Sequence, residues 1–222
     1  MPESDESNSR RPPSAFCRNP AAAALIFGGS FDPVHCGHIA ALRAALDFTG
    51  IPRGILLPAF VSPHKLMHAP AAAADRLKML HLALENHPQL SICEDELAAA
   101  RAVYTYDSLD QLRQRHREVN YTLLIGTDQL MALHRWHRAA DLVNEFPLCV
   151  LPRAHPPDFA LLSKQWGPKI AEQLRAAVLP IPTFPQSSSA IRTLIASGQS
   201  VSGLVPATVE AYIRKHRLYQ TR

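Results

Sequence analysis

The sequence predicts an α/β protein with a doubly wound, mostly parallel sheet that carries helices on both faces. Short apolar runs, typical of buried strands, alternate along the chain with segments whose apolar residues recur every three or four positions. Such alternation favours parallel strands joined through helical crossovers. It begins near residue 22, so we expect a disordered tail over residues 1–20 and a single domain over residues 21–222.

The strands are predicted from apolar runs that end at turn-forming residues. Gly28, Pro58 and Gly126 each follow one of these runs and are expected to end the strand. The predicted strands cover residues 22–27, 54–57, 90–93, 121–125, 148–151 and 178–181.

The helices are predicted from apolar residues at helical spacing. They are marked by Ile39–Leu46, Leu77–Leu84, Leu109–His116, residues 188–197 and Val209–Leu218. Thr105 or Asp107 is the expected N-cap of the third of these helices. Pro206 is expected near the first turn of the last, where a proline costs no hydrogen bond.

Composition limits the class of protein. The chain of 222 residues has 23 Lys and Arg against 19 Asp and Glu, a net charge of +4 that suits anionic small molecules and does not require nucleic acid. No apolar run approaches the roughly 18 residues of a membrane span, and no signal-peptide core precedes the first strand. The four cysteines are scattered without metal-ligand spacing, as in a reducing cytoplasm.

The most informative stretch lies between the first strand and the first helix. It begins with Gly28 and Gly29, which let a ligand approach the backbone, and ends with His35 and His38 at the start of the helix. A helix N-terminus favours an anion, and two imidazoles three positions apart can donate to the same phosphate chain. The sequence therefore predicts a nucleotide site at this edge of the sheet.

This stretch resembles the first motif of the nucleotidyltransferase superfamily that carries the H-x-G-H signature. The signature here is His35-Cys36-Gly37-His38, and the whole run is most similar to that of nicotinate-nucleotide adenylyltransferases. Ser30 stands where those enzymes usually carry Thr, which keeps a hydroxyl. The resemblance implies a Rossmann-like nucleotidyltransferase fold and an ATP site that includes Gly28, Gly29, Ser30, Phe31, His35 and His38.

A second motif lies near the C-terminus. Hydroxyl side chains followed by a helix with an arginine form a natural phosphate cradle, although an N-cap serine and a surface arginine would give the same pattern. Residues 186–192 resemble the I-S-S-T-x-I-R motif of the same superfamily, with Gln186 in place of Ile and Ser189 in place of Thr. The resemblance implies that Ser188, Ser189 and Arg192 bind ATP.

The residues expected to bind the second substrate, which accepts the nucleotide, are predicted from weaker matches to the family. Tyr104 and Thr105 resemble a segment that holds the nicotinate group in the family, and Thr105 could equally be a helix cap. Asp128 and Trp136 match a G-x-D-x-L-x-x-L-x-x-W pattern, in which Asp could accept ribose hydroxyls and Trp could stack on a pyridine ring or belong to the core. Arg153 follows the fifth strand, where the family has an arginine.

The resemblance implies a complete reaction. ATP and nicotinate mononucleotide would give nicotinic acid adenine dinucleotide and pyrophosphate, as in NAD biosynthesis. His35, His38, Lys65 and Arg192 are the expected catalytic residues, and Lys65, in a P-H-K loop after the second strand, would also bind nicotinate mononucleotide. Mg²⁺ would bind through ATP, because no carboxylate cage or other protein metal site is visible.

Other functions remain open from the sequence. A sister transferase could act on phosphopantetheine or on nicotinamide mononucleotide, and acceptor preference would distinguish these enzymes. The chain could also be a nucleotide-binding regulator without catalysis, although His35, His38, Lys65 and Arg192 are all present. A nucleic-acid-binding module is disfavoured because basic residues are not concentrated in one run. The sequence does not give the oligomeric state.

Overall fold

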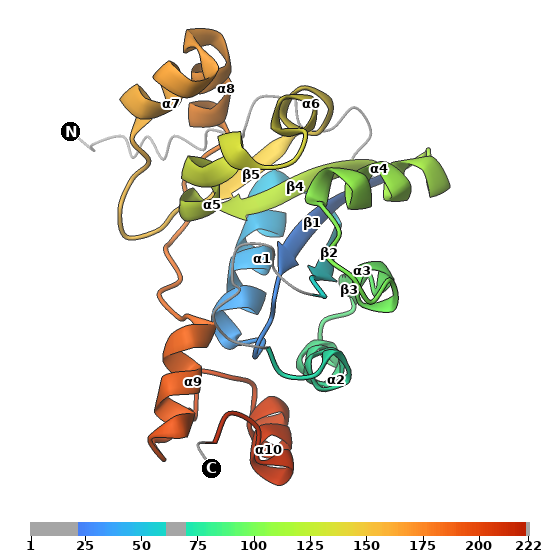
Figure 1. Ribbon diagram of the computed structural model, residues 1–222, viewed down its shortest axis with the longest axis vertical. Coiled ribbons are helices and arrows are strands. Elements are labelled where there is room, and N and C mark those ends of the chain that lie inside the picture. Colours follow the sequence, from blue (N-terminus) through green and yellow to red (C-terminus); the bar gives the residue numbers. More distant parts are fainter. Residues whose placement is uncertain (1–21, 61–69, 221–222) are drawn as a thin grey trace, which may run out of the picture.

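The computed structural model describes residues 22–60 and 70–220, and five parallel strands of this part form one sheet (Figure 1). The strand order is β3-β2-β1-β4-β5. The strands are β1 (Ala23–Gly29), β2 (Arg53–Pro58), β3 (Leu90–Ile92), β4 (Asn120–Gly126) and β5 (Leu148–Leu151).

Helices join the strands and follow the last one. Those up to β5 are α1 (Cys36–Thr49), α2 (Ala73–Leu84), α3 (Asp95–Ala98), α4 (Thr105–Arg115), α5 (Thr127–Ala132), the 3₁₀ turn η3 (Leu133–Arg135) and α6 (Ala139–Glu145). Those beyond it are α7 (Phe159–Trp166), α8 (Pro168–Ala176), α9 (Ser188–Ala196) and α10 (Ala207–His216).

The sheet is buried on both faces, and β1 shows this best. Ala23, Leu25 and Phe27 pack into the core formed with α1, α2, α9 and α10, whereas Ala24 and Ile26 pack into the core formed with α4, α6, α7 and α8. Side chains alternate between the faces of a strand, so a strand that is apolar at every position must be covered on both sides. The predicted doubly wound α/β class is confirmed.

The strand order determines where a ligand can bind. From β1 the chain passes through α1 to β2 and then to β3 on one side, and it returns from β3 to β4 on the other side of β1. In open parallel sheets a crevice forms at this switch point, beyond the carboxyl ends of the strands. The loop after β1 and the residues after β4 both lie there, as the sequence predicted.

Two local predictions are wrong. Residues 178–181 form no strand, because only Val178 pairs, through an isolated bridge to Val150, and Pro180 then removes a backbone donor. Neither Thr105 nor Asp107 is the N-cap of α4, since that position is Tyr104 and Thr105 is the first helical residue. The short helices α3, α5, α6, α7 and α8 were not predicted. The proposed tail over residues 1–20 lies outside the described residues.

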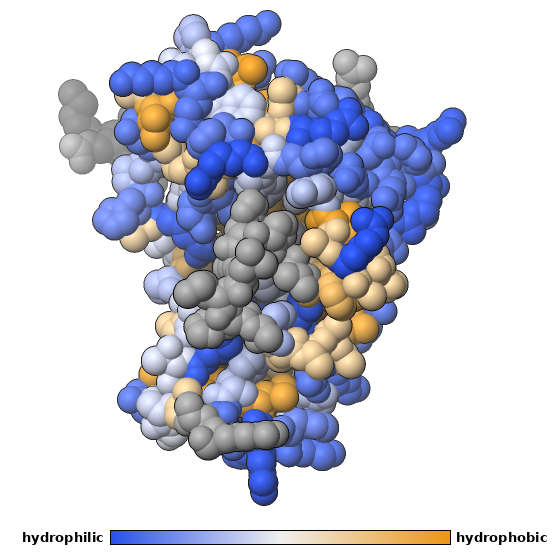
Figure 2. Space-filling model, viewed as in Figure 1, coloured by the Kyte–Doolittle hydropathy of each residue, from blue (hydrophilic) through white to orange (hydrophobic). Residues whose placement is uncertain are grey.

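The surface in Figure 2 is mainly hydrophilic, with hydrophobic residues in small groups. One such group lies over α3, where Ala98, Ala99 and Ala100 are exposed. Across the two described ranges, no helix has the length and apolar character needed to cross a membrane.

A buried arginine joins the loops at the carboxyl ends of β1 and β2. Arg76, on the buried face of α2, is 1% exposed. Its guanidinium donates to four backbone carbonyls, at distances between 2.6 and 3.2 Å: those of Ser30, Ala59, Phe60 and Ala71. A buried charge is tolerated only when its donors are satisfied, and buried carbonyls likewise need donors. Arg76 meets both needs at once.

We expect Arg76→Leu to lower the free energy of unfolding by about 3 kcal/mol or more, because it leaves several carbonyls without a donor. Urea unfolding followed by circular dichroism measures this change. Arg43→Leu is the matched control, since Arg43 is exposed on α1 and its replacement should stay within about 0.5 kcal/mol. Equal effects of the two variants would contradict the role of Arg76.

Candidate active site

Two histidines cap the start of α1 reciprocally. His35 is the N-cap residue, and its Nδ1 accepts the backbone N–H of His38 at 3.2 Å. The Nδ1 of His38 accepts the backbone N–H of His35 at 3.3 Å. A ring whose Nδ1 accepts a hydrogen bond carries its hydrogen on Nε2. The capping geometry therefore makes Nε2 of each ring a donor for an anion at the start of the helix.

The two rings are held face to face by their surroundings. Their centroids lie 3.5 Å apart with an interplanar angle of 21°. Phe31, which is 1% exposed, packs edge-on against His38 at 5.0 Å and has the left-handed φ of +46° that is uncommon for a bulky residue. Burial, and secondarily the nearby charge of Arg153, lowers the pKa of His35 to about 4, so this ring is neutral at pH 7.

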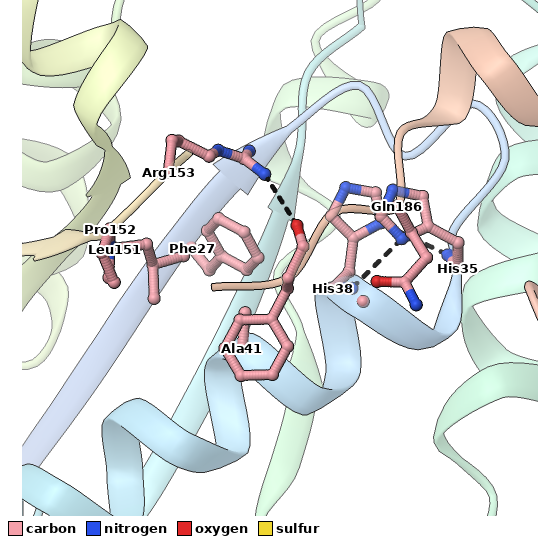
Figure 3. Close-up of a pocket in the computed structure, with 10 residues that line it drawn as sticks. Phe27, His35, His38, Ala41, Leu151, Pro152, Arg153 and Gln186 are labelled. Atoms are coloured by element: carbon pink, nitrogen blue, oxygen red, sulfur yellow. Dashed lines mark hydrogen bonds between the residues drawn. The ribbon is translucent and has the colours of Figure 1, made fainter. Parts of the chain in front are cut away.

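A small pocket lies beside the histidines, between the ends of β1 and β5 (Figure 3). Gln186 forms one wall and lies directly over Gly37, where an added Cβ would be 2.7 Å from its Oε1 and 3.1 Å from Nδ1 of His35. Any larger residue at position 37 would therefore displace these groups. The lining residues are Phe27, His35, Gly37, His38, Ala41, Leu151, Pro152, Arg153, Phe184 and Gln186.

The second motif docks onto the loop of the first. Ser188 donates its hydroxyl to the carbonyl of Pro33 at 2.9 Å, and Nη1 of Arg192 donates to the carbonyl of Asp32 at 2.6 Å. Nη2 of Arg192 lies 3.4 Å from Oγ of Ser189. The N-cap of α9 is Ser187, whose hydroxyl accepts the N–H of Ala190. The predicted ATP residues of both motifs thus meet at the start of α1.

Arg153 is shared between two parts of the site. Its Nη1 donates to the carbonyl of Phe184 at 3.3 Å, and its Nε lies 3.7 Å from Oδ1 of Asp128, which follows β4 (Figure 3 shows the first contact). Both predicted residues therefore lie at the crevice beside His35. Among the residues that the structure describes, none lies within 4 Å of a Cβ added at Gly28, so they leave the backbone there accessible to a ligand.

The remaining predicted acceptor residues form a separate group. Tyr104 is 50% exposed and stacks on His137 with centroids 4.4 Å apart. Thr105 is half-buried at the start of α4. Trp136, which follows η3, is half-buried and packs against the core on that face of the sheet. Lys65 lies outside the described residues.

Sequence reasoning missed four residues that shape the site: Arg76, Asp32, Gln186 as a pocket wall, and Tyr219. The periodicity of α2 could have revealed Arg76, because it precedes Met79 and Leu80 by three and four positions on the buried face. For Tyr219 no local signal exists, since its hydroxyl donates to Asp32, a residue 187 positions earlier.

Metal ligands are sparse in the described part of the chain, where no group of three or more His, Cys, Asp or Glu side chains could hold an ion. Asp32 is buried and accepts hydrogen bonds from Tyr219 and Ala71. Asp128 is exposed at the crevice. This donor set forms no protein cage for Mg²⁺, so the ion would fit here as one bound mainly by substrate phosphates and water.

Comparison with known proteins agrees with the resemblance seen in the sequence. The cytidylyltransferase-like family model matches residues 26–194. A probable nicotinate-nucleotide adenylyltransferase of Laribacter hongkongensis (strain HLHK9) is 38% identical over 216 residues, covering 91% of this chain and 96% of that protein. The chain belongs to the nicotinate-nucleotide adenylyltransferase family. A second probable member, from Synechococcus sp. (strain JA-3-3Ab), is 36% identical over 194 residues, which cover 87% of this chain and 93% of the relative.

The family fold is also found among solved structures. The Plasmodium falciparum nicotinic acid mononucleotide adenylyltransferase, solved in complex with NaAD, aligns with a TM-score of 0.71 at 20% sequence identity. The alignment covers 89% of this chain and 97% of that structure. At this sequence identity the match shows that the two proteins share a fold.

The depressed pKa of His35 predicts a pH-dependent stability. The unfolded chain binds a proton at this residue near pH 6.5 and the folded chain only near pH 4, so acid favours unfolding between these values. Between pH 7 and pH 4 we expect the wild-type protein to lose up to about 3 kcal/mol more unfolding free energy than His35→Asn. Asn can still cap α1 but does not titrate. Urea unfolding of both proteins at several pH values tests this prediction. Equal losses of unfolding free energy in the two proteins would contradict it.

Proposed function

We propose that this chain joins ATP and nicotinate mononucleotide to give nicotinic acid adenine dinucleotide and pyrophosphate. One observation carries the proposal. In a chain of this family, Ser188 and Arg192 dock onto the loop that leads into His35 and His38. Groups that can bind a polyphosphate therefore converge on one helix start at the switch point of the sheet.

The protein's part in this reaction is to position substrates and neutralise charge. The phosphate of nicotinate mononucleotide is already an anion, so it can attack the α-phosphorus of ATP in line without a protein nucleophile. We assign the Nε2 donors of His35 and His38 to ATP phosphate oxygens, with His38 nearest the transferred group. Because both rings are fixed by the capping bonds, they need little reorganisation as charge develops.

Other basic and hydroxyl groups would hold the leaving pyrophosphate. Arg192 and Lys65 are assigned to its charge, and Ser188 and Ser189 to its oxygens, through hydroxyl or backbone donors. Gly28, Gly29, Ser30 and Phe31 would form the floor of the ATP site. The contact of Arg192 with Ser189 supports this assignment, since it groups a cation with a hydroxyl at the start of α9.

The acceptor would bind on the side of α4 and η3. Trp136 offers an indole face for the pyridine ring, and Tyr104 and Thr105 offer donors at the start of α4 for its carboxylate. Asp128 would accept ribose hydroxyls, and Arg153 would lie beside the acceptor phosphate. The contact between Arg153 and Asp128 supports a common binding surface at the crevice.

Mg²⁺ would be held by ATP oxygens and water. When bound, the ion neutralises charge on the phosphates. We expect no nucleic-acid or membrane partner for this reaction. The cytoplasm is the proposed compartment, in keeping with the absence of any disulfide among the cysteines of residues 22–60 and 70–220.

Pyrophosphate release from ATP and Mg²⁺ tests the proposed acceptor. We expect release with nicotinate mononucleotide and far less with nicotinamide mononucleotide, because only the first has a carboxylate for the donors near Thr105. Phosphopantetheine is the third acceptor to assay. Preferred turnover with either of the other two would refute the proposed acceptor and leave the transfer chemistry in place. No release with any of the three would refute the proposed reaction.

His38→Ala tests the catalytic assignment. We expect kcat to fall on the order of 10²-fold, as when one preorganised donor to a developing charge is removed. Thermal unfolding of the same variant separates this loss from loss of the fold. Near-normal turnover by a folded variant would show that His38 does not contact the reacting phosphate.

A further inference from the structure

The carboxylate of Asp32 is held in one orientation from several sides. Asp32 is 6% exposed. Its Oδ1 accepts the hydroxyl of Tyr219 at 2.7 Å and the backbone N–H of Ala71 at 3.1 Å. Its Oδ2 lies 3.7 Å from Nη1 of Arg192. Because both hydrogen bonds use Oδ1, the second oxygen is left facing the arginine.

Arg192 takes its position from the same residue. Nη1 donates to the backbone carbonyl of Asp32 at 2.6 Å, so the guanidinium contacts both the main chain and the side chain of Asp32. Its Nη2 lies beside the hydroxyl of Ser189. The side chain is 30% exposed, which leaves part of it available to a ligand at the start of α1. A change in the orientation of Asp32 would therefore change the direction in which Arg192 points.

The C-terminal segment turns after α10, and this turn brings the Tyr219 hydroxyl to Asp32. After α10, Arg217 and Tyr219 both adopt left-handed φ values, +53° and +64°, which cost energy for residues with a side chain. Burial, together with the neighbouring Asp32, raises the pKa of Tyr219, so its phenol keeps its hydrogen and remains a donor. The left-handed Arg217 is the C-cap of α10, and the chain beyond it ends in a part-buried hydrogen bond to the loop of the first motif.

We propose that Tyr219 is a positioning residue for adenylyl transfer, which acts through Asp32 to direct Arg192 toward the triphosphate of ATP. Without the hydroxyl, Oδ1 of Asp32 has one donor fewer, and the carboxylate can turn to pair with Arg192 through both oxygens. Such a pair would compete with the phosphates for the guanidinium. This role rests on the proposed function, since it requires Arg192 to contact ATP.

Tyr219→Phe tests the proposal, and the chain supplies a matched control. Tyr212, on α10, also donates its hydroxyl to a carboxylate, Oδ1 of Asp75 on α2 at 2.9 Å, and neither residue belongs to the two motifs. We expect Tyr219→Phe to lower kcat/KM for ATP about tenfold while KM for the acceptor changes less than twofold. Tyr212→Phe should leave both within twofold. Both variants should lower the melting temperature by similar amounts, because each loses one hydrogen bond to a carboxylate.

A double-mutant cycle with Arg192→Ala separates positioning from stability. If Tyr219 acts through Arg192, Tyr219→Phe should cause no further loss of kcat/KM in the Arg192→Ala background. Independent, multiplying losses would overturn the proposal, as would equal kinetics for Tyr219→Phe and Tyr212→Phe.

A direct measurement of ATP binding keeps the test of Tyr219 separate from the test of the overall reaction. The affinity of the same variants for ATP with Mg²⁺ can be measured by calorimetry without any acceptor. If the wild-type protein binds ATP but transfers nothing to nicotinate mononucleotide, the proposed reaction fails. A loss of ATP affinity in Tyr219→Phe that disappears in the Arg192→Ala background would then still support the role of Tyr219. An unchanged affinity and an unchanged kcat/KM would reject it.

Discussion

The arrangement of the nucleotide end of the sheet depends on one buried cation. The guanidinium of Arg76 binds the carbonyls of Ser30, Ala59, Phe60 and Ala71, which belong to irregular backbone after β1, after β2 and before α2. Such backbone lacks partners in the sheet and must find donors when it is buried. A single side chain from α2 supplies them and so fixes two loops relative to one another.

A second junction lies at Asp32 and Pro33, where both motifs meet through backbone carbonyls. Ser188 and Arg192 bind these carbonyls, so the cradle at α9 is aligned with the start of α1 independently of most side chains in the loop. The histidines are aligned by backbone N–H groups in the same way. Main-chain groups are the least mobile parts of a fold, and they hold the side chains in place before a substrate arrives. Catalysis by electrostatic positioning benefits from this rigidity.

The sequence predicted much of this structure where the signal was local. Apolar runs were enough to predict the strands β1 to β5, and helical spacing was enough to predict the helices α1, α2, α4, α9 and α10. The run at 178–181 failed as a strand because Pro180 ends its pairing. The helices that were missed, α3 and α5 to α8, are only four to nine residues long.

In the candidate site, the local motifs were predicted from the sequence, but the contacts between distant residues were not. The spacing of His35 and His38 is local, and the capping geometry confirms that both lie at the start of α1. The docking of Ser188 on Pro33 spans 155 positions, and no pattern within either segment specifies such a contact. Arg76 was detectable from the period of α2, whereas the contact between Tyr219 and Asp32 required the three-dimensional structure.

The separation of Asp32 and Tyr219 has a consequence for how the chain folds during synthesis. Asp32, in the loop after β1, is synthesised 187 residues before Tyr219, so their hydrogen bond must wait for that stretch of chain. Contacts between such distant positions form late, because the intervening chain must first be ordered. This end of the sheet is thus completed late in folding. A ligand that binds at this end only after the contact has formed would stabilise the folded chain against unfolding by mass action.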